Sequence, residues 1–456
     1  MRPKRSAYVL CLCILFLVTE ICSADVSVNV PLGNWSYDAL DKLVSLGLVQ
    51  SAIFSAKPFT RLEMARLTIE ARSALEKQKD HLGASATRIA HELVQRLRKE
   101  FNAEIQEIEG TTKVSFYLKP FEDLYATYYH STEDFAFEYD KGREFCDGSS
   151  FKAGFSAHAA LFRHLAFYFN PEFRYSKGEF PSEDYKVSLL EGYGKLELWN
   201  IELEVGRDSL WWGPGRHGAL ILTDNVRPFD LIKISNPRPV VLPWIFKYLG
   251  LFKFQGFYTK LEGNRYIPKP ELMGFRVDIK PFPFLELGAS RTIILGGEGD
   301  NAPKGVSELS FTDWLKLLSG QNISGSLDTD QIAGVDATLH INNLDNFVRV
   351  LKTLDIWGQL YGEDEAASLP SRNGFVLGMR LGDIFLTGRT NLVIEHADNV
   401  INGYPNFWYN HHVYKSGYTY YKRIMGHEMG SEARDTYVSL EHYLRPDLIA
   451  WLSYDY

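Results

Sequence analysis

The sequence predicts a membrane all-β protein, namely an antiparallel transmembrane β-barrel that follows a small N-terminal α-helical bundle. After Gly110 the hydrophobic period changes from about 3.6 to about 2 residues and keeps that value to the last residue. Aromatic residues make up 14% of the chain. No segment after residue 24 approaches the roughly 18 apolar residues of a membrane-spanning helix. A chain of this composition that is exported is either a large soluble β protein or a membrane β-barrel.

Residues 1–24 have the features of a secretory signal peptide. Basic residues open this segment, an apolar stretch covers residues 7–18, and small residues precede Asp25. We therefore expect an exported chain that begins at Asp25. An uncleaved membrane anchor is the alternative, although the apolar stretch is short for a span. Three of the four cysteines lie in this segment, so Cys146 remains without a partner for an intrachain disulfide.

Residues 25–110 are expected to form the helical bundle. Asn34 or Ser36 can cap a short first helix, which Gly47 ends. Thr60 and Glu63 stand at the spacing of a capping box and predict the start of a second helix. A longer helix then carries one apolar stripe at every fourth position. The stripe consists of Ile89, Leu93, Leu97, Phe101 and Ile105.

Residues 111–456 are expected to form the barrel, with roughly 16 to 18 strands at about 20 residues per strand and connection. In residues 274–280, for example, Phe275, Val277 and Ile279 alternate with glycine and charged residues. One face of such strands is almost purely apolar. The other mixes full charges with glycines, which is typical of a wet lumen. A soluble β-rich architecture is the alternative.

The chain ends on an alternating segment, LIAWLSYDY. In a closed barrel the last strand pairs with the first, which we expect near residues 112–128, and no free edge remains. This ending resembles the C-terminal signature of bacterial outer-membrane proteins, which implies recognition by the barrel-assembly machinery. The residues expected to meet membrane lipid are Leu448, Leu452, Tyr454 and Tyr456.

Two loops have the residue types that bind sugars. Residues 206–218 combine Arg207 and Asp208 with the adjacent rings of Trp211 and Trp212. Such rings can stack on pyranoses while charged groups hold hydroxyl or acidic substituents. Two tryptophans in an aromatic belt at the membrane interface are the alternative. The aromatic-rich residues 404–421 allow the same two interpretations, and for most of them we favour the belt.

No pattern of catalytic residues occurs. The chain lacks a phosphate-binding glycine loop and a nucleophile elbow, and His427-Glu428 lacks the second histidine of a zinc-protease helix. The acidic residues 363–365 could bind a divalent cation, but a solvated loop is the simpler interpretation. We therefore expect no enzyme activity, no cofactor and no metal. The formal net charge of −8 argues against nucleic acid as a partner.

Several motifs together resemble the Wzi family of outer-membrane capsule-assembly proteins, over essentially all of the mature sequence. They are the opening residues 30–35, residues 58–65, Trp212-Gly213-Pro214, Asn225-Val226-Arg227-Pro228, Gly426-His427-Glu428-Met429-Gly430 and the terminal strand. The resemblance implies an 18-stranded barrel in the bacterial outer membrane, with a periplasmic helical bundle at its inner mouth. It also implies a non-catalytic, lectin-like role that holds capsular polysaccharide or exopolysaccharide at the cell surface.

The expected partners are surface polysaccharide, outer-membrane lipid and, during biogenesis, the barrel-assembly machinery. A diffusion porin is the alternative function. Residues 31–65 also look like a single S-layer-homology repeat, in which Arg61 could touch an anionic polymer. The residues that we expect to contact polysaccharide are Arg207, Asp208, Trp211, Trp212, Arg227 and His427.

Overall fold

The structure, a computed structural model, describes residues 26–456 except 79–81, 112–115, 146, 178–184, 301, 319–326, 367–368 and 404. The predicted signal peptide and Cys146 lie outside the described residues. Within the described part, no helix has the length and apolar character needed to cross a membrane.

The N-terminal part is helical, as the sequence predicts. The helices are α2 (Trp35–Ser45), α3 (Arg61–Gln78), α4 (Ala84–Glu100) and α5 (Asn102–Ile108). The Asn34 side chain accepts a hydrogen bond from the Ser36 N–H, which caps α2. Glu63 N–H donates to the Thr60 hydroxyl at the start of α3. The long helix that we predicted is interrupted at Phe101, which separates α4 from α5.

The rest of the described chain forms a closed barrel of 18 strands with antiparallel pairing, so the predicted antiparallel β-barrel is confirmed. The strands are β2 (Phe116–Lys119), β3 (Leu124–Ser131), β4 (Gly148–Phe155), β5 (Ala157–Leu161), β6 (Leu165–Lys177), β7 (Tyr185–Leu198), β8 (Ile201–Asp208), β10 (Phe229–Ser235), β11 (Val240–Val241), β12 (Leu251–Lys260), β13 (Glu271–Phe282), β14 (Leu285–Leu295), β15 (Asp330–Ile341), β16 (Thr353–Ala366), β17 (Leu369–Ile384), β18 (Thr390–Asp398), β21 (Arg434–Arg445) and β22 (Leu448–Asp455).

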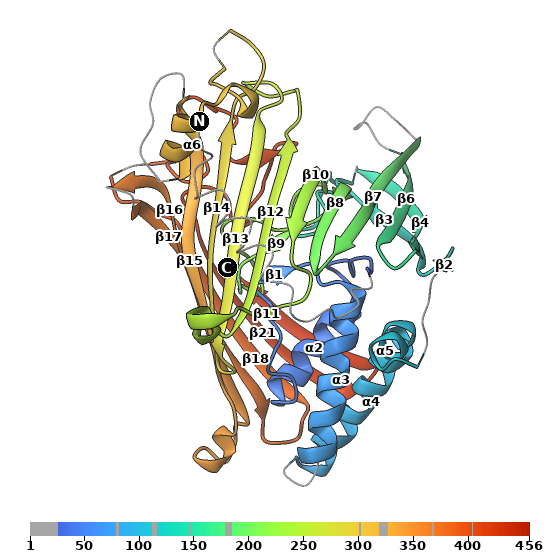
Figure 1. Cartoon of the computed structure of the whole chain (residues 1–456). Helices are drawn as coiled ribbons and strands as arrows, with labels where there is room; N and C mark the ends of the chain where they lie inside the picture. The colour runs from blue at the N-terminus through green and yellow to red at the C-terminus, as the bar shows by residue number, and fades with distance from the viewer. Residues whose placement is uncertain are drawn as a thin grey trace, which may run out of the picture.

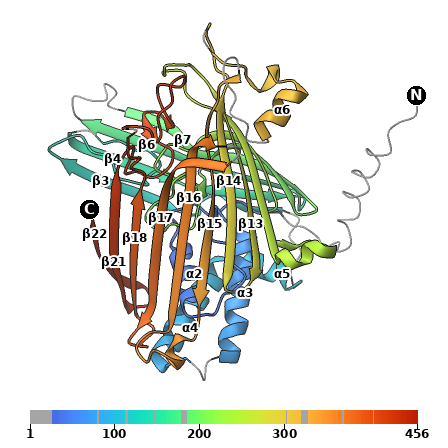
Figure 2. The ribbon, with the colours of Figure 1, turned by 90° about the vertical axis from the view of Figure 1, so that its left-hand side faces the viewer.

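The two ends of the barrel differ. Short turns, such as residues 283–284 and 446–447, join strands at one end, and helices α2 to α4 lie there (Figures 1 and 2). The opposite end carries the long connections 209–228 and 399–433 and helix α6 (Phe311–Leu318). Two small sheets are separate from the barrel wall: β1 (Ala56–Lys57) with β9 (Trp211–Trp212), and β19 (Thr419–Tyr420) with β20 (Arg423–Ile424). In the barrel order β22 lies between β21 and β3.

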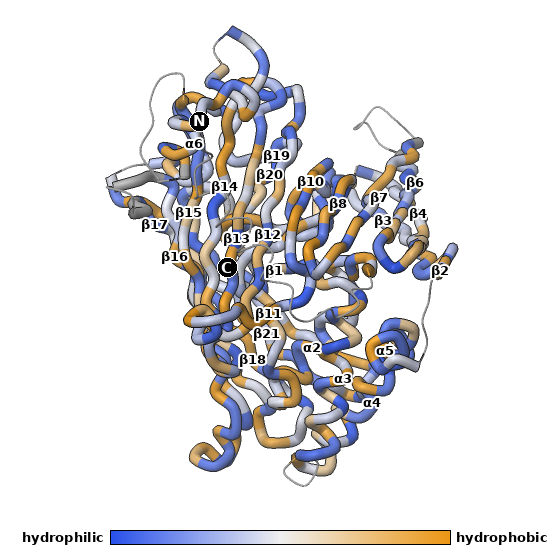
Figure 3. Tube along the Cα trace, in the orientation of Figure 1, coloured by the Kyte–Doolittle hydropathy of each residue, from blue (hydrophilic) through white to orange (hydrophobic). Residues whose placement is uncertain are grey.

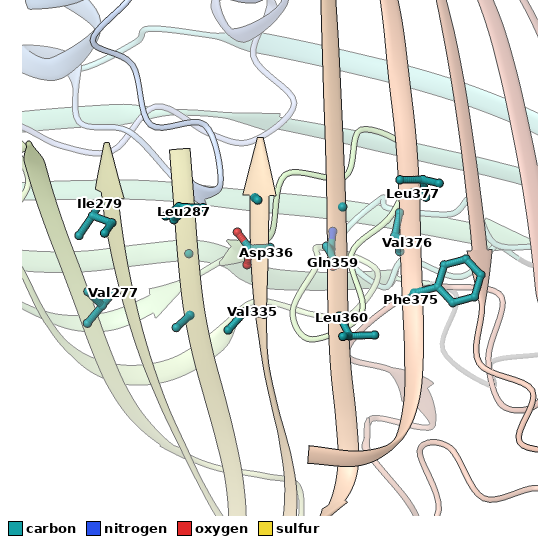
Figure 4. Close-up of a pocket in the computed structure, with 14 residues that line it drawn as sticks. Val277, Ile279, Leu287, Val335, Asp336, Gln359, Leu360, Phe375, Val376 and Leu377 are labelled. Carbon is teal, nitrogen blue, oxygen red and sulfur yellow. The ribbon is translucent and has the colours of Figure 1, made fainter. Parts of the chain in front are cut away.

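The strands alternate between an apolar outer face and a polar inner face, and this alternation is visible along the chain trace (Figure 3). On neighbouring strands, Val335 and Leu377 are each 57% exposed, whereas Asp336 and Gln359 are buried. Figure 4 shows this part of the wall, where the small residues Ala289, Ala337 and Gly358 leave a shallow apolar trough between larger side chains. Such an outer surface is suited to lipid.

The inner face does not line an open, wet lumen at the level of the N-terminal segment, so that expectation is wrong there. Lys253 and Lys280 donate to the carbonyl oxygens of Ala56 (2.9 Å) and Ala52 (2.8 Å). The guanidinium of buried Arg380 pairs with Asp41 of α2. The charged side chains of the inner face therefore bind residues of the N-terminal segment. These contacts take the place of the water that we expected around the charges.

Arg61, the residue considered for polymer binding, is buried instead. Its guanidinium pairs with Glu100 (3.0 Å), Glu104 (2.6 Å) and Glu122. Glu122 follows β2, so the contact joins the helices to the barrel wall. This arrangement leaves Arg61 a structural role.

Candidate functional site

A basic groove lies near the end of the barrel that carries the long connections. It has a volume of about 210 Å³ and lies between strands β6 to β8 and the loops around residues 142, 227 and 420. Six cationic side chains line it, against Glu172 as the lining carboxylate. The cations are Lys141, Arg143, Arg174, Lys186, Arg207 and Arg227.

Arg207 forms one wall of this basic groove. It follows Gly206, whose φ of +143° and close approach to the backbone of Gly192 (2.4 Å from an added Cβ) leave no room for a side chain. Both Nε and Nη2 of Arg207 donate to Asp230 on β10, each at 2.7 Å. Nη1 donates to the Leu189 carbonyl at 2.9 Å. The Arg207 side chain is thus held in a bidentate pair and still 35% exposed.

Arg227 enters the groove from the loop before β10. Its guanidinium carbon lies 4.5 Å from the ring centre of Tyr421, a distance typical of a cation–π contact. The loop at Gly142 presses against the backbone of Arg227, since a Cβ at Gly142 would lie 2.7 Å from the Arg227 nitrogen. Among the described residues neither Arg227 nor Lys186 has an ion-pair partner.

The other cations of the groove are paired. Arg143 holds Glu172 through Nη2 (2.8 Å), and Arg174 approaches the same carboxylate at 3.5 Å. Lys141 pairs with Glu191 at 2.6 Å. Two arginines share Glu172, and Arg227 and Lys186 have no ion-pair partner among the residues that the structure describes. The described lining of the groove therefore has an excess of positive charge. Such a site is suited to an anion with several acceptor oxygens.

Asp208, Trp212 and His427 do not line the groove. Asp208 is buried and accepts from Asn29 Nδ2 at 2.7 Å. Trp212 is 0% exposed, and its Nε1 donates to Gln255 at 2.8 Å. Burial lowers the pKa of His427 to about 4, which keeps its imidazole neutral.

Trp211 is also buried, because β9 folds into the barrel and pairs with β1. Lys57 lies over its ring at 5.4 Å. The interpretation of Trp211 and Trp212 as a membrane-interface belt is therefore wrong. The long loop between β8 and β10 is packed inside the protein, with both rings in its core.

The aromatic residues of the 404–421 segment separate into two groups. Most are buried and form an interior cluster, so the expected belt at the membrane interface is wrong for them. Tyr421, by contrast, is 43% exposed at the groove. The buried members are Trp408, Tyr409, Tyr414, Tyr418 and Tyr420.

Comparison with known proteins gives the same family as the sequence motifs. A family model described as capsule assembly protein Wzi matches residues 126–456. The chain belongs to this family. Family membership and the closed barrel with an apolar outer face make it a bacterial outer-membrane protein.

Two relatives extend this result. A Klebsiella pneumoniae protein, described as an uncharacterized 55.8 kDa protein in the cps region, is 30% identical over 207 residues. The match covers 44% of this chain and 38% of that protein, so the chain spans well under half of that relative's length. The solved structure of Escherichia coli Wzi is similar with a TM-score of 0.66 at 22% identity, over 94% of this chain and 85% of that one. That protein is described as a carbohydrate-binding β-barrel involved in group 1 capsule assembly.

The sequence motifs point to Arg207 and Arg227 but not to the other cations that line the groove with them. Lys141 and Arg143 lie on the loop between β3 and β4, Arg174 lies on β6 and Lys186 on β7, and none of them belongs to a motif recognised in the sequence. Tyr421 was noticed only as part of an aromatic-rich segment. No signal in the sequence brings these positions together, because the barrel closure creates their proximity.

Proposed function

We propose that this chain is a non-catalytic, lectin-like protein that holds an acidic capsular polysaccharide or exopolysaccharide in the basic groove. The proposal rests on two cations, Arg227 and Lys186, which have no ion-pair partner in the described part of the chain and line the groove together with the exposed ring of Tyr421. Arginine binds carboxylates in a bidentate manner, and a tyrosine ring can pack on a pyranose. The carbohydrate binding described for the similar Escherichia coli barrel supports the same function.

The six residues selected from the sequence enter this proposal with different roles. Arg207 and Arg227 contact the polymer. The other four stabilise the loops that present these arginines, since their side chains are buried. These four are Asp208, Trp211, Trp212 and His427.

We further propose that the groove does not catalyse hydrolysis. Glu172, its lining carboxylate, accepts from Arg143 at 2.8 Å and from the Tyr125 hydroxyl at 3.0 Å. Both contacts hold this carboxylate to the protein's own donors, and the described lining of the groove has no second carboxylate to complete the pair that glycoside hydrolysis uses.

The orientation in the membrane follows from the same proposal. The groove lies near the barrel end with the long connections, which we place outside the cell. The helical bundle of residues 25–110 then faces the periplasm, and residues 111–456 form the wall. Outer-membrane lipid covers the apolar face, and the barrel-assembly machinery inserts the chain.

Binding to a purified polymer tests the groove directly. The protein in detergent is titrated with a uronic-acid polymer and with the same polymer after carboxyl reduction. We expect the double substitution Arg227→Gln with Lys186→Gln to weaken binding of the acidic polymer at least tenfold. Lys269→Gln is the matched control, because this exposed lysine pairs with Glu298 outside the groove.

Wild-type affinity of the double variant, or equal binding of the reduced polymer, would contradict the groove assignment. The attachment role has a separate test in cells. Deletion of the gene should release polysaccharide into the medium, and unchanged retention on the cell would exclude the role.

A further inference from the structure

A second cluster of polar side chains adjoins the groove loops. His217 comes from the loop between β9 and β10, Glu428 from the loop before β21, and Asp435 and Asp455 from the last two strands. The Nε2 atom of His217 lies 3.2 Å from Asp455 Oδ2, 3.4 Å from Asp435 Oδ2 and 3.8 Å from Glu428 Oε1. His217 Nε2 is thus the common neighbour of three carboxylates, and ligand atoms of His217, Glu428, Asp455 and the exposed Glu138 all lie within 4.8 Å of one another.

Asp435 is the unusual member of this cluster. Its side chain is only 6% exposed, and neither carboxylate oxygen has a hydrogen-bond partner among the described residues. The Nε2 atom of His217 also lacks one. Buried polar atoms without partners are rare, and each costs free energy unless a bound group satisfies it.

Neighbouring rings fix the direction of the His217 imidazole. It stacks on Tyr437 with a centroid distance of 4.1 Å and an interplanar angle of 5°. The ring of Tyr139 meets it edge-on at 5.8 Å. The imidazole is therefore held with Nε2 toward the carboxylates, as a metal ligand must be.

His427 supports the cluster from its buried side. Its Nδ1 accepts the Met429 N–H at 3.3 Å, which assigns the ring proton to Nε2. That Nε2 is buried, has no hydrogen-bond partner and lies 3.7 Å from Asp435 Oδ2. His427 is thus placed to orient Asp435 and does not itself coordinate.

We propose that His217, Glu428, Asp435 and Asp455 bind a divalent first-row transition-metal ion such as Zn²⁺ or Mn²⁺. Two ligand atoms that each lie about 2.0–2.2 Å from a tetrahedral ion are roughly 3.3–3.6 Å apart. The distances from His217 Nε2 to its three neighbours span this range. The negative charge of three carboxylates is larger than the positive charge of one protonated imidazole, so the cluster attracts a cation. An imidazole ligand favours Zn²⁺ or Mn²⁺ over Ca²⁺ and Mg²⁺.

Sequence motifs do not reveal this site, because its ligands come from segments that are far apart in the chain. His427-Glu428 lacks a second histidine at helical spacing, and the fold supplies His217 from another loop. A bound ion connects the loops that carry His217 and Glu428 to strands β21 and β22. Asp455, whose side chain is 39% exposed, lies on the open side by which an ion can enter.

Metal titration tests the site. The detergent-solubilised full chain is freed of metal with a chelator and titrated calorimetrically with Zn²⁺, Mn²⁺ and Ca²⁺. We expect one Zn²⁺ or Mn²⁺ per chain and at least tenfold weaker binding of Ca²⁺. Asp435→Asn and Asp455→Asn should each weaken binding at least tenfold, and His427→Gln roughly tenfold.

The control is Asp328→Asn, which removes the carboxylate that lies 3.0 Å from His412 and 3.6 Å from His411 in another loop cluster. This variant should keep wild-type affinity. Heat-modifiable migration on gels reports folding, and if Asp435→Asn does not fold, the more exposed Asp455→Asn decides. Absence of saturable Zn²⁺ and Mn²⁺ binding, or wild-type affinity of Asp455→Asn, would overturn the site in favour of an imidazolium ion-paired with carboxylates.

Discussion

Arg227 combines two interactions that few other side chains can make together. Its planar guanidinium lies over Tyr421, and the edge of the plane remains available for a carboxylate. Lysine keeps the charge but loses the planar fork. At the scale of a single residue, the shape of the cation therefore matters as much as its charge.

The substitution Arg227→Lys measures that contribution. We expect roughly tenfold weaker binding of the acidic polymer, because the bidentate contact and much of the ring contact are lost. Titration calorimetry against the uronic-acid polymer provides the measurement. Arg434→Lys is the control, since this exposed arginine pairs with Asp398 outside the groove. Equal affinities of wild type and Arg227→Lys would show that only net charge is recognised.

Gly142 determines where Arg227 stands. Its φ is +61°, and an added Cβ would lie 2.7 Å from the Arg227 nitrogen. We expect Gly142→Ala to lower the free energy of unfolding by about 1–3 kcal/mol and to weaken polymer binding, because both the backbone and the arginine must shift. Gly33→Ala is a matched control, since no atom lies within 4 Å of its added Cβ. If Gly142→Ala kept both the polymer affinity and the thermal unfolding of the wild type, the position of Arg227 would not depend on Gly142.

Trp212 illustrates the difference between a sugar platform and a packing residue. Its ring is fully buried, lies 5.3 Å from that of Phe257, and donates to Gln255. We expect Trp212→Ala to destabilise the protein by about 3–5 kcal/mol. Thermal unfolding measures this cost, with the exposed Trp199→Ala as the control. In the folded fraction the polymer affinity should match wild type within about twofold, and a selective loss of affinity would restore Trp212 as a contact residue.

At the scale of elements, local chemistry predicted the helices well. The Asn34 cap, the Thr60–Glu63 spacing and Gly47 (φ +74°) all act where the sequence places them. The break at Phe101 was not predicted, because the apolar stripe continues through it. The insertion of Trp211 and Trp212 beside β1 was also not predictable, since it joins residues about 150 positions apart.

The contact between helices and wall should depend on pH through Glu122. Burial alone would raise its pKa, but the hydrogen bond to His158 and the charge of Arg61 lower the pKa to about 2. A lowered carboxyl pKa stabilises the folded state above the unfolded pKa of about 4.5. This stabilisation is lost as the pH falls toward 2.

We therefore expect hydrogen exchange in α4 and α5 to stay constant from pH 7 to about 4.5, after correction for intrinsic exchange rates, and to accelerate below that pH. Glu122→Gln should accelerate exchange already at pH 7 and flatten the pH dependence. Glu76→Gln on α3 is the control, because Glu76 is exposed and outside the Arg61 cluster. Constant protection down to pH 2 in wild type would show that Glu122 does not hold the bundle.

At the scale of the molecule, the alternation of apolar and polar residues predicts the barrel wall but not which residues fill the barrel interior. Phe275, Val277 and Ile279 face outward as their two-residue period predicts, and Asp278 faces inward. The sequence does not show that Ser55 donates to that aspartate at 2.9 Å. Charged residues on the inner face of a strand suggest a water-filled lumen when the residues that pair with them are far away in the sequence. For the same reason the groove emerged only from the assembled barrel.

The filled lumen predicts that the intact protein does not conduct ions as a porin does. The N-terminal segment is held by Lys253, Lys280 and Arg380 across the barrel interior. Displacing it would leave buried charges unpaired, which costs several kcal/mol. Planar-bilayer recordings of the full chain should show no steady openings, with a general porin in the same bilayer as the positive control. Arg380→Gln removes the contact between Asp41 and the barrel wall and leaves Asp41 paired with Arg216. This variant should produce brief openings, because the segment then loses one anchor but not the others. Large steady openings of the wild-type protein would mean that the segment leaves the lumen spontaneously, and the diffusion porin would again become the better account of its function.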